Sequence, residues 1–144
     1  MKALFATSRD ATLMLMRLVL GIVFFAHGSQ KAPGWFGGYG FHATMHMFTT
    51  MMHIPTVFAF LAIGAEFVGG ICLLLGFCSR IAAFGIAIVM LVAIFKVHLP
   101  HGFFAPMGME YPFVLLALAV LILVKGGGAL SIDGAMAGEP EYAR

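Results

Sequence analysis

The fold is decided first by a long apolar segment near the N-terminus, ATLMLMRLVLGIVFFAHGSQK (Ala11–Lys31). Its interior carries one charged side chain, Arg17, and the segment ends in His27 and Lys31 instead of further apolar residues. At 1.5 Å per helical residue, a segment of this length spans about 30 Å, the thickness of the hydrocarbon core of a bilayer. The sequence therefore predicts a membrane helix with a polar far end.

The composition extends this interpretation to the whole chain. Of the 144 residues, 62% are hydrophobic and 10% are charged, and the mean hydropathy is +1.04, whereas soluble domains carry about 25% charged residues. Apolar stretches recur along the chain, so we expect one membrane domain over residues 1–144, in contact with membrane lipids. The formal net charge of +2, without a basic cluster, gives no support to a nucleic-acid partner.

Four apolar segments predict an all-α, integral membrane four-helix bundle. Lys2 and Arg9 precede the first segment as in a signal peptide, but no small-x-small cleavage site follows, so we expect a retained helix. Asp10 is expected to cap the first helix and Ser79 the third. Each segment is about long enough to cross the hydrocarbon core, the fourth being the shortest. The predicted helices cover about residues 11–31, 56–78, 80–98 and 110–125.

The distribution of basic residues predicts the orientation of this bundle. The two termini and the turn between the second and third helices hold most of the Lys and Arg residues, while the other side holds only Lys31 and Lys96. By the positive-inside rule, both termini are expected in the cytoplasm and the protein in a bacterial inner membrane. The segment between the first two helices then lies outside, where we expect an interfacial helix.

The predicted spans and their ends carry ionisable side chains, which are costly in lipid unless they have partners or face an aqueous cavity. Counting from the external helix ends places Glu66 about 15 Å and Arg17 about 21 Å deep, a gap that an extended arginine can close. The pair is either a buried ion pair that only fixes helix register or the floor of a cavity. The candidate ligand-binding or proton-handling residues are Arg17, His27, Lys31, Glu66, His98 and Glu110.

Each of these candidates also has an explanation without a function. Glu110 suits the N-terminus of a helix, Lys31 and Lys96 can extend to the membrane surface, and His27 can be a packed helix-end residue. Titratable side chains nevertheless recur at the external ends of the predicted helices, and this common position favours a shared site over chance placement.

The external segment between the first two helices raises a separate possibility. His42 and His46 are four residues apart, His53 falls about 20° from the face of His42 on a helix, and methionines are interleaved. Imidazole and thioether ligands suit copper. The methionines lie on several faces, however, as in an interfacial helix, and this spacing is a weak metal signal. His42, His46 and His53 are therefore weak candidates for a metal or haem site.

Motifs for a bound redox centre are absent from the sequence. It contains no CxxCH, no cysteine-rich cluster, no GxGxxG and no Walker loop, which leaves covalent haem, an iron–sulfur centre, a dinucleotide domain and an ATPase without support. Cys72 and Cys78 lie about 240° apart around one predicted helix, so they cannot form a disulfide with each other. We expect both to be buried, inert thiols.

Three segments resemble the motifs of the DoxX family of small four-helix membrane proteins, in the order in which that family has them. They are RLVLGIVFFAHGSQK, GAEFVGGICLLLGFCSRIAA and EYPFVLLALAVLILVKGGGALSID. Two features depart from the family pattern, namely the His/Met-rich external segment and the KGGGA after the fourth helix. The resemblance carries over Arg17, His27, Gly28, Lys31, Glu66, Gly70, Gly76, Arg80, Glu110, Ser131 and Asp133.

The resemblance implies redox work at a membrane. Members of the family include the quinone-reducing membrane subunit of a thiosulfate:quinone oxidoreductase and a subunit of a mycobacterial membrane oxidoreductase complex assembled with superoxide dismutase and a sulfurtransferase. We therefore expect a quinone-interacting subunit of a membrane oxidoreductase complex, with partner protein subunits and no covalent cofactor. The alternatives are an accessory, structural subunit of a larger membrane complex and, on thinner grounds, a small-solute or metal transporter.

Overall fold

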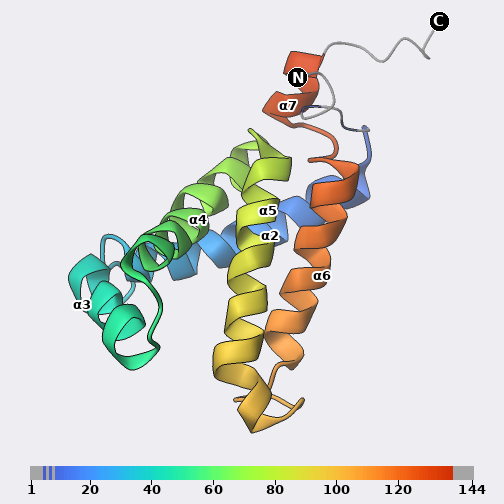
Figure 1. The fold of residues 1–144 in the computed structure, drawn as a ribbon. Helices are drawn as coiled ribbons and strands as arrows, with labels where there is room; N and C mark the ends of the chain where they lie inside the picture. Colours follow the sequence, from blue (N-terminus) through green and yellow to red (C-terminus); the bar gives the residue numbers. More distant parts are fainter. Residues whose placement is uncertain (1–4, 6, 8, 138–144) are drawn as a thin grey trace, which may run out of the picture.

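The computed structural model describes residues 5, 7 and 9–137, and these residues form helices and connections without a strand. Three helical segments are long and apolar enough to cross a membrane. They are α2 (Ala11–Lys31), α4 (Thr56–Leu75) and the continuous run Ser79–His101. This run consists of α5 (Ser79–Ala93), which Figure 1 labels, a π-helix η2 (Ile94–His98) and a 3₁₀ turn η3 (Leu99–His101).

Helices α2 and α4 contact each other through glycines. A Cβ atom on Gly28 would lie 2.4 Å from backbone atoms of Phe67, and a Cβ atom on Gly70 would lie 2.4 Å from the backbone nitrogen of Phe25. Neither position has room for a side chain, so these contacts fix the antiparallel register of the two helices. In this register the N-terminal part of α4 extends past Lys31, the last residue of α2.

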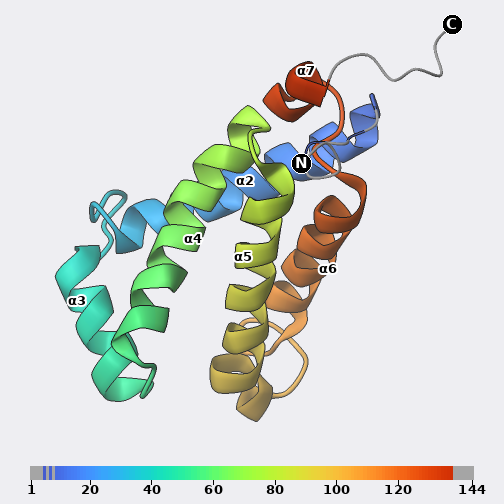
Figure 2. The same ribbon diagram turned by 45° about the horizontal axis from the view of Figure 1, so that its top comes forward.

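A short helical segment covers the part of α4 that α2 leaves uncovered. It consists of α3 (Gly40–His46) and the π-helix η1 (Met47–Met51), and its Phe48 is buried against Ala59 and Ile63 of α4. In both ribbon views α3 lies beside the N-terminal half of α4 (Figures 1 and 2). A helix is thus present where the sequence predicts one, and its apolar side packs on α4.

Helix α6 (Glu110–Lys125) returns along α5 after the turn that follows η3 (Figure 1). Its 16 residues extend about 24 Å, so it is shorter than the three apolar spans. The main core lies where α2, α4, α5 and α6 meet. Its fully buried apolar side chains are Leu20, Phe24, Leu73, Ala83, Ile86, Ala119 and Ile122.

The helices converge at one end of the molecule and separate at the other. At the convergent end, three residues join α4 to α5, and α7 (Ile132–Ala137) packs beside this turn, with the Asp133 N–H donating to the Gly76 carbonyl at 2.9 Å. At the splayed end, α3 and the start of α4 lie apart from the turn between η3 and α6 in both views (Figures 1 and 2). The start of α2 and the end of α6 belong to the convergent end.

The predicted helix limits hold for the first and fourth segments and need correction for the others. The second helix ends at Leu75 because Gly76, with φ of 66°, terminates it in the left-handed conformation. The third starts at Ser79 and changes to a π-helix after Ala93. Asp10 caps α2 as predicted, accepting a hydrogen bond from the Thr12 N–H at 2.7 Å.

Candidate functional site

An ion pair between Lys31 and Glu66 lies toward the splayed end. The Lys31 ammonium lies 2.5 Å from each carboxylate oxygen of Glu66. The Glu66 side chain is 3% exposed, whereas the Lys31 side chain is 27% exposed. A buried carboxylate thus has its charge balanced by a cation that solvent or a ligand can reach.

The register of α2 and α4 explains why these two side chains meet. Gly28 faces Glu66 and Phe67 across the helix contact, and Lys31 lies one turn farther along α2. Gly70 faces α2, and Gly69 faces α5. At 100° per residue, Glu66 lies about 40° around α4 from Gly70, in the direction of Gly69. The carboxylate therefore points toward the inside of the helix cluster, where Lys31 reaches it from the end of α2.

His27 belongs to the same flank of α2 and marks where the core opens. It is one turn before Lys31 and interacts electrostatically with both Lys31 and Glu66. Leu20, seven residues earlier and about 20° away around the helix, is fully buried, and Phe24 is 1% exposed. His27 itself is exposed. The inward flank of α2 thus changes from closed core to accessible surface within two turns.

Aromatic rings flank this site on two sides. The Lys31 ammonium lies 5.8 Å from the centroid of the Phe48 ring, within the range of a cation–π contact, so η1 partly covers the cation. On the other flank of the α2–α4 contact, Phe25 stacks on Phe67 with ring centroids 6.0 Å apart, and Trp35 meets both rings edge-on. The pair is thus exposed only in part, beside an apolar surface.

Arg17 does not meet Glu66, so the predicted ion pair is wrong. The Arg17 side chain is almost fully buried at the convergent end, where it donates hydrogen bonds to the carbonyls of Leu73, Gly127 and Leu130 at 2.6–3.1 Å. The prediction rests on placing the external ends of the two helices at one depth. They are staggered instead, so that Glu66 lies level with Gly28 of α2, about 16 Å along the helix from Arg17.

Two further charged side chains at the convergent end, Asp133 and Arg80, also bind the backbone at helix ends. Asp133 of α7 is 2% exposed and accepts hydrogen bonds from the N–H groups of Cys78 and Ser79 at 2.7 and 2.8 Å. Arg80 donates to the carbonyls of Leu123 and Val124 at the end of α6. The predicted cap by Ser79 is wrong, because Ser79 is the first residue of α5 and the Asp133 carboxylate caps that helix instead.

The remaining two candidates belong to the turn between α5 and α6. His98 Nδ1 lies 2.8 Å from the Met107 carbonyl oxygen, and the Glu110 carboxylate accepts a hydrogen bond from the Ala105 N–H at 3.1 Å. Both contacts are local to this turn. The structure therefore brings together His27, Lys31 and Glu66, and it leaves His98 and Glu110 in a separate polar group.

The histidines of the segment between α2 and α4 are exposed, two on α3 and one in the connection to α4. His42 and His46 lie about one turn apart on α3, while His53 lies after η1 and has a positive φ of 52°. Within residues 5, 7 and 9–137, no three His, Cys, Asp or Glu side chains gather as a metal site. Met45, Met47 and Met52 instead pack beside the apolar cluster on α4.

Two features of this arrangement depend on tertiary structure that no local sequence pattern indicates. Asp133 is singled out in the sequence only by the family resemblance, because nothing local shows that α7 returns to the start of α5. Phe48 is one of many apolar residues in its segment, and its place over Lys31 depends on how α3 and η1 fold back on α4. The glycines of α2 and α4 are the sequence signal for the register of these helices.

Comparisons with known proteins identify the family of this chain. The chain is 27% identical over 120 residues to a Bacillus subtilis protein named "Putative oxidoreductase CatD", covering 83% of both chains. It is 26% identical over 125 residues to an uncharacterized Haemophilus influenzae protein, covering 85% of this chain and 81% of the relative. No solved structure matches the chain. The DoxX family model matches residues 12–99, which include α2, α4 and α5, so the chain is a membrane protein that belongs to the DoxX family.

Proposed function

We propose that this protein is a quinone-interacting subunit of a membrane oxidoreductase complex. The observation that carries the proposal is the Lys31–Glu66 pair with His27 on the inward flank of α2, where the buried core gives way to accessible surface. Paired charges on a membrane-spanning helix are costly unless they serve packing or a ligand. The name of the Bacillus subtilis relative, an oxidoreductase, is consistent with the proposal.

The chemistry of these three side chains fits the head group of a quinone. Reduction to the quinol adds two electrons and two protons to the two carbonyl oxygens. The Lys31 ammonium is placed to donate a hydrogen bond to one carbonyl oxygen, and Glu66 and His27 are groups that can hold and deliver protons. The electrons come, in this proposal, from a partner subunit.

The approach of the quinone follows from which surfaces are accessible. The partly exposed Lys31 and the exposed His27 offer an accessible face on the inward flank of α2. The Phe48 ring, which now lies over the ammonium, is the neighbour that an incoming ring would replace or stack on. Apolar side chains on both helix pairs suit the isoprenoid tail.

The proposal includes a placement in the membrane. We infer four crossing helices, with α6 as the fourth, and a cytoplasmic convergent end, because Arg9, Arg80 and Lys125 lie on that side. The splayed end, with α3 and η1 at the outer surface of a bacterial inner membrane, then faces outward. Lys31, the last residue of α2, then reaches from the outer boundary toward Glu66.

An accessory, structural role is the second candidate, and the convergent end favours it. Arg17, Arg80 and Asp133 all bind backbone groups at helix ends, as in a scaffold. Under this alternative, the Lys31–Glu66 pair only joins α2 to α4 while other subunits bind the quinone.

Cross-linking with a photoactivatable azidoquinone separates these functions. In the purified complex, we expect labelled peptides from the second half of α2 and from η1, with labelling reduced in Glu66→Gln. The matched control is Lys96→Gln, which removes an exposed cation of η2 without touching the pair. Labelling confined to another subunit, or equal in Glu66→Gln and the unchanged chain, would support the accessory role instead.

A further inference from the structure

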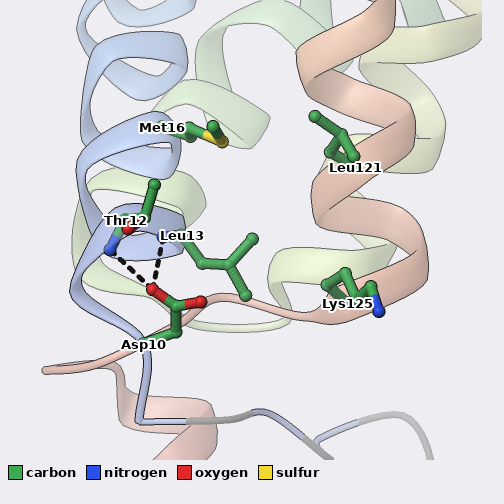
Figure 3. A pocket seen from close by; sticks show the side chains of 6 residues that line it. All are labelled: Asp10, Thr12, Leu13, Met16, Leu121 and Lys125. Atoms are coloured by element: carbon green, nitrogen blue, oxygen red, sulfur yellow. Dashed lines mark hydrogen bonds between the residues drawn. The ribbon is translucent and has the colours of Figure 1, made fainter.

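A second region of interest is a hollow at the convergent end, between the start of α2 and the end of α6. Its volume is about 340 Å³, and its lining combines polar and apolar side chains (Figure 3). The residues that line it are Asp10, Thr12, Leu13, Met16, Leu121 and Lys125. None of them belongs to the Lys31–Glu66 site, which lies toward the other end of α2.

The lining changes from polar to apolar along the direction of the helices. Asp10 and Lys125 mark the ends of α2 and α6. Met16 lies about 9 Å deeper along α2 than Asp10, and Leu121 about 6 Å deeper along α6 than Lys125. Where helices leave a bilayer, the same change occurs from head groups to acyl chains. The hollow therefore matches a lipid molecule in the order of its polar and apolar parts.

Two opposite charges at the mouth of the hollow have binding capacity left. One oxygen of Asp10, Oδ1, accepts from the N–H groups of Thr12 and Leu13, while Oδ2 accepts no hydrogen bond within the described part of the chain. The Lys125 ammonium has no hydrogen-bond or ion-pair partner among the described residues, and its stem lines the rim in Figure 3. Since the Asp10 carboxylate already occupies the positive end of α2, a simple anion is not favoured beside it.

We propose that this hollow binds a phospholipid with an ethanolamine head group. Its phosphate pairs with Lys125 at the rim, its ammonium donates hydrogen bonds to Asp10 Oδ2, and an acyl chain covers Leu13, Met16 and Leu121. A choline head group has no N–H to donate, and a glycerol head group has no cation for Asp10. The pair of charges therefore selects for ethanolamine.

The test is lipid retention by the purified full-length protein, measured by native mass spectrometry. The delipidated protein is incubated with an equimolar mixture of phosphatidylethanolamine, phosphatidylcholine and phosphatidylglycerol that carry the same acyl chains. We expect one phosphatidylethanolamine to be retained with a preference of roughly threefold to tenfold over the other two, the range for a charged hydrogen bond partly screened by solvent.

Two variants and one control assign this preference to the hollow. Asp10→Asn keeps the Oδ1 cap of α2 and removes the charge, so it should fold normally and lose the preference for ethanolamine over choline. Lys125→Gln should lower the retention of all three lipids. Lys96→Gln, at the opposite end of the molecule, should change neither.

Three results would overturn the proposal. The first is equal retention of the three lipids by the unchanged protein, and the second is an ethanolamine preference that persists in Asp10→Asn. The third is displacement of the bound lipid by equimolar glycerophosphoethanolamine, because a water-soluble head group that binds as well as the lipid would show that the apolar lining contributes nothing.

Discussion

The two ends of helix α2 use their charged side chains in different ways. At the convergent end, Arg17 is almost fully buried and donates hydrogen bonds to backbone carbonyls at the end of α4 and in the segment before α7. Toward the splayed end, Lys31 binds the side chain of Glu66 and keeps a quarter of its surface exposed. A buried charged side chain that binds backbone groups at helix ends stabilises the packing of those helices. A partly exposed charged side chain that binds another side chain can exchange this partner for a ligand.

The largest effect is expected from Arg17→Gln. The guanidinium donates to carbonyls in two segments, and glutamine cannot reach both. Hydrogen bonds to charged groups contribute about 1.5–3 kcal/mol each, so the substitution should lower the free energy of unfolding by at least about 3 kcal/mol. Thermal unfolding in mild detergent measures this loss.

Arg17→Lys sharpens the same test. An ammonium has one nitrogen and cannot span the carbonyls that the guanidinium fork joins, so we expect partial rescue at best. If Arg17→Gln unfolds at the same temperature as the unchanged protein, the structural role of this end is disproved.

A smaller loss is expected where α2 and α4 touch. A methyl group at Gly28 would collide with the backbone of Phe67, so Gly28→Ala should cost about 1–3 kcal/mol and loosen the Lys31–Glu66 pair. Gly64, in the partner helix α4, has no atom within 4 Å of an added Cβ and provides the control.

Gly64→Ala should leave stability unchanged or raise it by up to about 1 kcal/mol, because alanine favours the helix. Equal stability of the two alanine variants, measured in one detergent, would show that α2 and α4 do not meet at Gly28.

The loss of the α5 cap is expected to have the smallest effect. Asp133→Ala removes the acceptor of the Cys78 and Ser79 N–H groups and should cost about 0.5–2 kcal/mol. Asp133→Asn, which keeps one acceptor oxygen, should retain part of this stability. If Asp133→Ala raises hydrogen exchange nowhere in the first turn of α5, the cap is not formed in the membrane.

The sequence predicts local features of this fold well because their causes are local. The limits of α2 follow from Asp10 as a cap and Lys31 as the end of the apolar run, and α6 spans Glu110–Lys125 as expected. The sequence also places Lys31 and Glu66 among the candidates for one site, with Lys31 at the end of α2 and Glu66 about 15 Å inside α4. The choice of partner does not follow from the sequence, because it depends on the register of two helices.

That register is a tertiary property. Counting depth from a common plane brings Arg17 near Glu66, whereas the glycine contacts stagger the helices and bring Lys31 there instead. The sequence does not predict the capping role of Asp133 for a similar reason, because this role depends on how the segment after α6 returns to α5. The separation of His98 and Glu110 from the pair follows from the splay between the two helix pairs.

The central claim, that Lys31 and Glu66 bind a ligand rather than only join two helices, is tested most directly in a variant that keeps the fold without the charges. Replacing a buried ion pair by apolar residues of similar volume is often neutral for stability, so the double variant Lys31→Met with Glu66→Leu should assemble like the unchanged protein. The measurement is the quinone content of the folded, purified complex. The account predicts that the double variant retains little or no quinone, and a folded double variant with unchanged quinone content would contradict it.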